Sequence, residues 1–365
     1  MEQKLQDIIA ERIRADGPIS FADFMEACLY YPRLGYYMNE EEKIGAGGDF
    51  YTSPLLSASF GAMLGRQLEE FWYLLGARPF TVVEYGAGTG MLSFDILQYL
   101  KGNPALYEKL RYCIIEISPA MRRAEQMHLK DKVCWYEHID AVEGTVDCVF
   151  SNELLDNFPV HQVVMEEELM EVFVTFDGEF KEVLLPAREE LKTYFGELNL
   201  RLPRGYRTEV NLRALDWIGH IARRLQRGYI LTIDYGGCSE ELYKAWRSCG
   251  TLVCYHQHKR NDQPFINIGK QDITAHVNFS ALEHWGRKAG IASCGLTTQA
   301  LFLLSLGFRE HLRSRPPDQH KQMVQLAMEE AQIVHNLLWD MGQKIKVLVQ
   351  ARNMPPAALR GFALG

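Results

Sequence analysis

The pattern of apolar and polar residues between positions 80 and 152 alternates between two periods. Four apolar runs have the length and composition of buried strands: FTVVEYG at 80–86, RYCIIEI at 111–117, KVCWYEH at 132–138 and VDCVFSN at 146–152. Segments 91–101 and 119–129, which lie between runs, have helical spacing. Buried strands that alternate with helices are typical of a parallel sheet covered on both faces, so the pattern predicts a doubly wound α/β core.

The pattern changes at residue 160. Residues 160–200 alternate polar with apolar side chains around an Asp-Gly pair, which predicts an inserted antiparallel hairpin layer. The α/β pattern then resumes, and the remaining predicted elements are a helix over 211–226, a strand over 228–236, a helix over 239–248, a strand over 250–260, helices over 279–289 and 318–341, and a last strand over 343–351.

These elements divide the chain into predicted regions. They are an N-terminal helical and loop extension at 1–78 that contributes to the active site, a Rossmann-like nucleotide-binding core at 79–159, the hairpin insertion at 160–208, the continued core at 209–257, a substrate-side loop and helical region at 258–342, and a final strand with a tail at 343–365. Segment 30–57, rich in Tyr and Gly, is predicted to be loop within the extension.

Composition narrows the classes of partner and location. The chain has 365 residues, 47% of them hydrophobic, and a net charge of -8 without a long basic run, so we expect no nucleic-acid partner. No stretch approaches the ~20 apolar residues of a membrane-spanning helix. Residues 1–17 mix both charge signs, unlike a secretory signal or transit peptide, which predicts a soluble cytoplasmic protein.

The cysteines and histidines do not predict a metal site. None of the eight cysteines forms a C-x-x-C pair. The densest cluster, Cys249, Cys254, His256 and His258, fits no common zinc spacing, and we interpret it as structural.

Three glycines at alternate positions follow the first predicted strand. Gly86, Gly88 and Gly90 give the spacing G-x-G-x-G, whereas a dinucleotide fingerprint has its third glycine one place later, where Met91 stands. The spacing favours a nucleoside without a pyrophosphate, such as S-adenosylmethionine. Glu84, two places before the turn, adds to this interpretation.

Two other segments are candidates for contacts with that cofactor. Glu116 closes the second predicted strand and is followed by Ile117, and a carboxylate there can accept hydrogen bonds from both ribose hydroxyls. The other candidates precede a predicted helix whose N-terminus could meet the methionine carboxylate: Asp49, Tyr51, Thr52 and Ser53. A surface loop with a simple helix cap is the alternative for that segment.

Polar residues after the later strands are candidates for catalysis. Ligands gather beyond the carboxyl ends of parallel strands, so we expect Asn152, Glu153, Asp156 and Asp234 to converge near the reacting atoms, with Glu153 and Asp156 as the first catalytic candidates and Asp234 in reserve. If the nucleophile is a guanidinium, carboxylates must hold it. Asp156 could instead cap a helix, and Asp234 could fix neighbouring backbone amides. His276 is a candidate base or substrate contact, or a structural histidine.

The ordered set of motifs resembles one known family. The motifs are YYPRLGYY, GDFYTSP, VVEYGAGTG, IIEISPAMR, SNELLDNFPV, LTIDYGG and DITAHVNFSAL, between residue 30 and about 282. Together they are similar to the S-adenosylmethionine-dependent methyltransferases related to the mitochondrial complex I assembly factor that methylates arginine. In the fifth of these motifs NELLDNFPV stands where we expect NEFFDALPV, a change of aromatics that bears on the substrate pocket.

The resemblance implies a fold, a cofactor and a substrate class. The implied fold is the α/β class I methyltransferase fold, with a seven-stranded, mostly parallel sheet, an N-terminal helical extension and an inserted β-rich and helical substrate region. The implied cofactor is S-adenosyl-L-methionine, and the implied partner is a protein carrying arginine, such as a complex I-type subunit whose assembly depends on the modification. A homodimer is one possible assembly state.

Three functions remain open at this point. The first is methyl transfer to arginine on a partner protein. The second keeps the cofactor and changes the nucleophile to a small-molecule oxygen or nitrogen. The third is an assembly factor that binds S-adenosylmethionine with little turnover.

Overall fold

The computed structural model describes residues 4–40, 57–129, 132–314 and 323–364, and these form two compact units. The first unit combines residues 1–50, 155–218 and 236–285, and the second combines residues 51–154, 219–235 and 286–365. Each unit therefore gathers segments that are far apart in the sequence.

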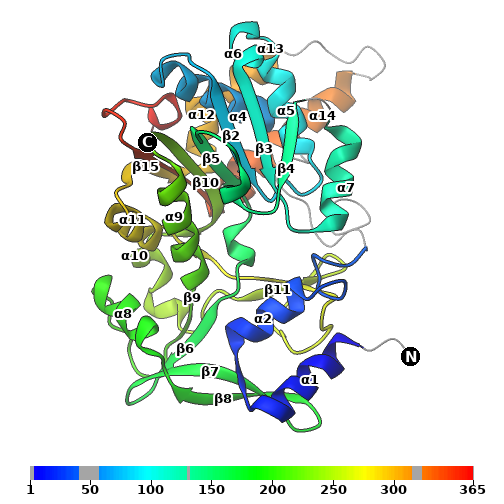
Figure 1. Cartoon of the computed structure of the whole chain (residues 1–365), viewed down its shortest axis with the longest axis vertical. Helices are drawn as coiled ribbons and strands as arrows, with labels where there is room; N and C mark the ends of the chain where they lie inside the picture. The colour runs from blue at the N-terminus through cyan, green and yellow to red at the C-terminus, as the bar shows by residue number, and fades with distance from the viewer. Residues whose placement is uncertain (1–3, 41–56, 130–131, 315–322, 365) are drawn as a thin grey trace. The chain divides into compact units, whose positions relative to one another are not determined.

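The second unit is built on a sheet in the order β15-β16-β10-β5-β2-β3-β4, drawn in the upper part of Figure 1. Its strands are β2 (Phe80–Tyr85), β3 (Leu110–Ile115), β4 (Val133–Tyr136), β5 (Cys148–Asn152), β10 (Gly228–Gly237), β15 (Ala292–Thr298) and β16 (Ile345–Arg352). The pairs from β4 to β10 are parallel, and β16 is antiparallel to both neighbours. The predicted mostly parallel sheet is confirmed with its seven strands, and a two-residue eighth strand, β14 (Val277–Asn278), pairs with β10.

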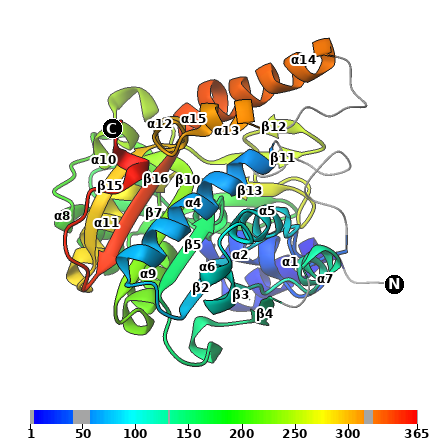
Figure 2. The same ribbon diagram turned by 90° about the horizontal axis from the view of Figure 1, so that it is seen from above.

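Helices of the second unit cover the sheet because its strands are apolar. They are α4 (Ala58–Leu74), α5 (Met91–Leu100), α6 (Pro104–Lys109), α7 (Pro119–His128), α12 (Gln299–Ser305), α13 (Phe308–Ser314), α14 (Met323–Val334) and α15 (Met341–Lys344). Helices α4 and α5 lie side by side over one face, where Val82, Phe150 and Leu231 join them in the core (Figure 2). The helix predicted over 318–341 ends as α14 at Val334 and continues as a π-helical turn to Asp340.

The first unit contains the insertion and a five-stranded sheet. Its strands are β1 (Ile19–Ser20), β6 (His161–Met165), β7 (Leu169–Phe176), β8 (Phe180–Pro186) and β9 (Arg207–Val210). The turn between β7 and β8 carries Gly178 at a φ of 77°, the conformation expected of the Asp-Gly pair. The predicted hairpin is present, and three more strands extend it into a layer.

Helices surround this layer and the segments that follow it. They are α1 (Leu5–Asp16), α2 (Phe21–Tyr30), α8 (Glu189–Glu197), α10 (Ser239–Leu242), and the parts of α9 (Leu212–Arg224) and α11 (Phe279–Lys288) that lie within the unit. Ser20 caps α2 by accepting a hydrogen bond from the backbone N–H of Asp23 at 3.1 Å.

Two predicted elements of the first unit are wrong. The strand expected over 250–260 is a hairpin of β11 (Val253–His256) and β12 (Lys259–Asn261), and β13 (Asp272–Thr274) pairs with β11 to complete a small sheet. Gln257 and His258 form its turn with left-handed φ of 50° and 59°. Neither residue is glycine, so the sequence did not predict this turn.

The helix expected over 239–248 is also wrong. Helix α10 ends at Leu242, because Lys244 is extended, and only the short 3-10 turn Ala245–Arg247 follows. Strand β14 (Val277–Asn278) then pairs with the last two residues of β10. Among the described residues, no helix is both long enough and apolar enough to span a membrane.

Candidate active site

The glycine turn after β2 has a backbone that other residues rarely adopt. Gly86, Gly88 and Gly90 have φ of 64°, 60° and 78°, all in the left-handed region. A Cβ on Gly86 would lie 2.7 Å from Leu154 Cδ1, and one on Gly90 would lie 3.0 Å from the Cα of Glu125. The backbone conformation therefore favours glycine at both positions, the crowding against the Glu125 backbone adds to this at Gly90, and Gly90 begins α5.

Glu84 lies just before this turn and is bonded within the protein. Its carboxyl oxygen Oε2 accepts hydrogen bonds from Tyr112 Oη at 2.6 Å and from the Ser93 hydroxyl. Burial raises the pKa of Glu84 to about 7, although both hydroxyls lower it. Glu84 thus links β2 to β3 and α5.

Glu116 lies directly after β3, at the same edge of the sheet as the glycine turn. Its side chain is 8% exposed, and Oε1 accepts a hydrogen bond from Ser118 N at 2.6 Å. Burial raises the pKa of this carboxyl. The next residue, Ile117, exposes 51% of its surface. Ser118 also caps α7, so the carboxylate and the start of that helix are held together.

The end of β5 carries a strained residue. Glu153 has a φ of 50°, which is uncommon for a residue with a side chain and often marks a functional position. Its N–H donates to the carbonyl of Ile233 at 2.9 Å, and Asn152 Nδ2 donates to its Oε1 at 3.2 Å. Asn152 Oδ1 is buried and has no hydrogen-bond partner among the described residues.

Asp234 on β10 holds this turn in place. It is fully buried, and its carboxylate accepts hydrogen bonds from the backbone N–H of Leu154 at 3.1 Å and of Tyr235 at 2.8 Å. This geometry is the amide-fixing alternative that its sequence position left open, and it makes Asp234 a support for Glu153.

Asp156 belongs to the first unit, in a 3-10 turn over Leu155–Asn157. Tyr30 Oη donates to the carbonyl of Asn157 at 3.2 Å, and Tyr37 Oη donates to Asp272 Oδ1 at 2.9 Å. The two tyrosine rings stack with centroids 5.7 Å apart. Tyrosines of the YYPRLGYY motif therefore pack beside the acidic turn.

His276 is also in the first unit and is held neutral. Arg247 Nη1 lies 3.3 Å from His276 Nδ1, and because a guanidinium only donates, Nδ1 accepts and the proton is on Nε2. Burial, together with the charges of Arg247 and Arg260, lowers the pKa of His276 to about 4. In this state Nε2–H can donate a hydrogen bond. Nδ1 cannot act as a base, because it already accepts from Arg247.

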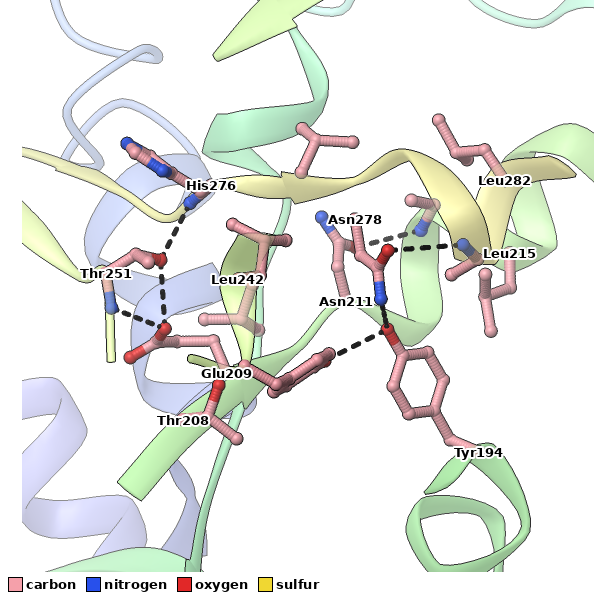
Figure 3. Close-up of a pocket in the computed structure, with 15 residues that line it drawn as sticks. Tyr194, Thr208, Glu209, Asn211, Leu215, Leu242, Thr251, His276, Asn278 and Leu282 are labelled. Atoms are coloured by element: carbon pink, nitrogen blue, oxygen red, sulfur yellow. Dashed lines mark hydrogen bonds between the residues drawn. The ribbon is translucent and has the colours of Figure 1, made fainter. Parts of the chain in front are cut away.

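A pocket in the first unit lies next to His276 (Figure 3). Its polar lining groups largely bond to one another: Thr251 N donates to Glu209 Oε2 at 2.8 Å, and Asn278 Nδ2 donates to Tyr194 Oη at 2.8 Å. The cavity measures about 20 Å³, which holds a single water molecule and no arginine side chain. We therefore interpret these polar groups as structural.

The structure gathers only part of the predicted site. The second unit places Gly86, Glu116, Glu153 and Asp234 at the carboxyl ends of the neighbouring strands β2, β3, β5 and β10. Asp156 and His276 belong to the other unit. The predicted contacts Asp49, Tyr51, Thr52 and Ser53 lie outside the described residues.

Two residues of the site carried no signal in the sequence. Glu125 bonds to Trp135 Nε1 at 2.7 Å and lies against Gly90, but it stands in the polar segment PAMRRAEQMH. Arg247 fixes the His276 tautomer from a segment that was predicted to be helix. Both contacts join segments distant in sequence, and no local pattern records them.

Comparison with known proteins places the chain in a family. A family model described as S-adenosyl-L-methionine-dependent methyltransferases matches residues 63–297, more than half of the chain. A solved structure from Burkholderia thailandensis with bound S-adenosyl-homocysteine is 33% identical, covers 99% of this chain and 95% of its own, and has a TM-score of 0.89. These findings confirm the predicted cofactor and the predicted class of enzyme.

Curated relatives were also found. The protein named "Protein arginine methyltransferase NDUFAF7 homolog, mitochondrial" from Drosophila melanogaster is 29% identical, over 80% of this chain and 72% of its own length. The Xenopus tropicalis protein of the same name without "homolog" is 28% identical, over 96% and 87%. The predicted resemblance is confirmed.

The predicted cytoplasmic location is wrong by this comparison, because the relatives are named as mitochondrial. The mixed charges of the first residues reflect α1, whose apolar face, including Ile9 and Ile13, is buried in the first unit. They describe a packed helix and carry no information on destination.

Proposed function

Because this chain belongs to the S-adenosyl-L-methionine-dependent methyltransferases, we propose that it transfers a methyl group to an arginine side chain of a partner protein. The names of the curated relatives support this acceptor. The observation that carries the proposal is the strained Glu153 backbone, which fixes a carboxylate at the carboxyl end of β5.

The residues of the second unit fit the cofactor. The left-handed glycine turn leaves no space for a side chain at Gly86, and Glu116 offers a buried carboxylate as an acceptor for ribose hydroxyls. Asn152 Oδ1 is a buried acceptor that lacks a donor among the described residues. We assign these three residues to cofactor binding.

The cofactor supplies the methyl group as an electrophile on a sulfonium. The protein aligns the acceptor, so that a guanidinium nitrogen forms its bond to carbon as the sulfur–carbon bond breaks. Glu153 holds the guanidinium through charge-assisted hydrogen bonds and favours loss of one N–H proton to solvent.

Substitution of Glu153 by Gln tests the assignment. We expect methyl transfer to an arginine peptide to fall at least about 100-fold, while the affinity for S-adenosyl-homocysteine changes little. Glu143→Gln, an exposed residue of the same unit, is the matched control and should leave both unchanged. Equal losses of turnover and cofactor affinity in Glu153→Gln would contradict the catalytic role.

The finer proposal is that the partner is a subunit of a respiratory complex I-type assembly. Mass spectrometry of host cells with and without the protein should find an arginine methylation that disappears from such a subunit. Activity on a metabolite extract without peptide would favour a small-molecule nucleophile. Full complementation by a Glu153→Gln variant without turnover would favour an assembly role. Light scattering would report whether a homodimer forms.

A further inference from the structure

Glu125 is a buried acid on a helix whose other residues are exposed or partly exposed. All ten residues of α7 are described, and Glu125 is the buried one, at 0% exposure. It approaches Gly90 so closely that a Cβ there would lie 3.0 Å from its Cα. A fully buried acid needs a partner, because an unpaired buried charge is costly.

The partners of Glu125 leave one of its oxygens facing another acid. Trp135 Nε1 donates to Oε2 at 2.7 Å. The other oxygen, Oε1, is buried and has no hydrogen-bond partner among the described residues, and the side chain that acts most strongly on Glu125 is the carboxyl of Glu116. Two carboxyl groups can share a hydrogen bond only if one of them carries a proton.

The surroundings decide which acid is protonated. The charged or titratable groups that act on Glu125 are the acids Glu116 and Glu84, and Trp135 is its one neutral donor. Burial and repulsion from these acids raise its pKa. Glu116 instead accepts from the N–H groups of Ser118 and Ile117, which stabilise its ionised form. The proton therefore belongs on Glu125.

We propose that Glu125 is a positioning residue that remains protonated and donates Oε1–H to Glu116, so that Glu116 stays ionised and oriented as the acceptor for the cofactor ribose. The inference rests on the cofactor role proposed for Glu116. It assigns the acid on α7 to the cofactor site although it need not touch the cofactor. A glutamine amide at this position can donate the same hydrogen bond at every pH.

Calorimetric titration with S-adenosyl-homocysteine between pH 6 and pH 9.5 tests the proposal on the full chain. Wild-type affinity should fall at least tenfold as Glu125 ionises at alkaline pH. Glu125→Gln should bind within about threefold of wild type at pH 7 and lose much less affinity at alkaline pH, which separates this effect from titration of the ligand. Glu125→Ala, which cannot donate, should bind at least tenfold more weakly at pH 7.

The outcomes separate this inference from the role of Glu116. If Glu116→Gln binds as tightly as wild type, the ribose contact itself is wrong. If Glu116→Gln weakens binding but Glu125→Gln retains the full alkaline loss, or matches Glu125→Ala at pH 7, the positioning role alone is overturned. Should Glu125→Ala fail to fold by circular dichroism, the pH profile of Glu125→Gln decides.

Discussion

Two buried glutamates, one in each unit, differ in almost everything except their burial. Glu171 on β7 is 1% exposed, and its carboxylate accepts from Arg188 Nε at 2.9 Å and His161 Nδ1 at 2.8 Å. These donors lower its pKa even though burial raises it. Glu125 is equally buried but faces acids, and its pKa is raised. Burial alone therefore does not decide whether an acid is charged.

The difference separates acids that stabilise the fold from acids that serve a site. An acid paired with cations has its hydrogen-bonding capacity used within the protein. In the second unit Glu84, Glu116 and Glu125 lie near each other and act on each other's pKa, and no cation of the described residues is among the groups that shift them. Such a cluster reduces the free-energy cost of burying charge by keeping protons on some of its carboxyl groups. Its ionised carboxylates can accept hydrogen bonds from a ligand.

The largest expected effect is on the paired acid of the first unit. Glu171→Ala leaves Arg188 and His161 without their acceptor and should lower the free energy of unfolding by about 3 kcal/mol at pH 7, at the low end for a buried pair because Arg188 is partly exposed. Glu125→Gln should cost less than about 1 kcal/mol. Urea unfolding measures both, and similar losses would remove the contrast.

The stabilisation that the Glu171 pair provides should decrease as the pH falls. The pKa of Glu171 is lowered in the folded protein, so its stabilisation is present above the ordinary value of 4.5 and is lost as the pH falls through the folded pKa. The difference between wild type and Glu171→Ala should therefore shrink below pH 4.5. A difference that grows on acidification would contradict the pairing.

A somewhat smaller effect on the free energy of unfolding is expected at His276, and it depends on pH. Its pKa is lowered to about 4 from 6.5, so its contribution is present above pH 6.5 and is lost as the pH falls toward 4. The loss should reach about 2 kcal/mol at pH 5. His276→Gln cannot take up this proton, so the stability gap between it and wild type should narrow by that amount between pH 7 and pH 5. A constant gap would show that the imidazole is not held neutral.

Gly86→Ala should cost about 1 to 2 kcal/mol and weaken cofactor binding, because it strains the backbone and meets Leu154. Gly144 is the matched control, since its φ of 75° is also left-handed but a Cβ there meets nothing within 4 Å. Gly144→Ala should cost about 1 kcal/mol and leave the affinity for S-adenosyl-homocysteine unchanged. If both variants lose affinity equally, the glycine turn is not part of the ligand site.

The sequence predicted the sheet and the glycine turn because both depend on local pattern. Strands such as β2 and β5 are continuous apolar runs, and a glycine turn between strand and helix is visible in one short segment. The turn of the β11–β12 hairpin was missed, because Gln257 and His258 adopt left-handed conformations through their context.

The site residues named from the sequence stay a prediction, and the structure adds the contacts that bear on their roles. The bonds of Asp234 to the amides of Leu154 and Tyr235 depend on how β10 lies beside β5. Glu125 was missed for the same reason, since its burial results from packing against Gly90 and Trp135. Contacts between distant segments decide the charge and the role of a carboxyl.

The smallest expected effect is that of removing the Trp135 N–H, which donates to Glu125. Trp135→Phe removes the N–H that fixes Oε2 and keeps most of the ring's apolar surface, so it should cost less than about 1 kcal/mol of stability. Without that donor the Glu125 carboxyl can rotate, and binding of S-adenosyl-homocysteine should weaken about two- to threefold. Trp72→Phe removes an equivalent bond, from Nε1 to the carbonyl of Arg78 at 2.8 Å, and should affect stability alone. Because both variants delete the same group in the same unit, a loss of affinity in the first and not in the second would show that the indole acts through Glu125, whereas equal affinities would reduce Trp135 to a packing residue.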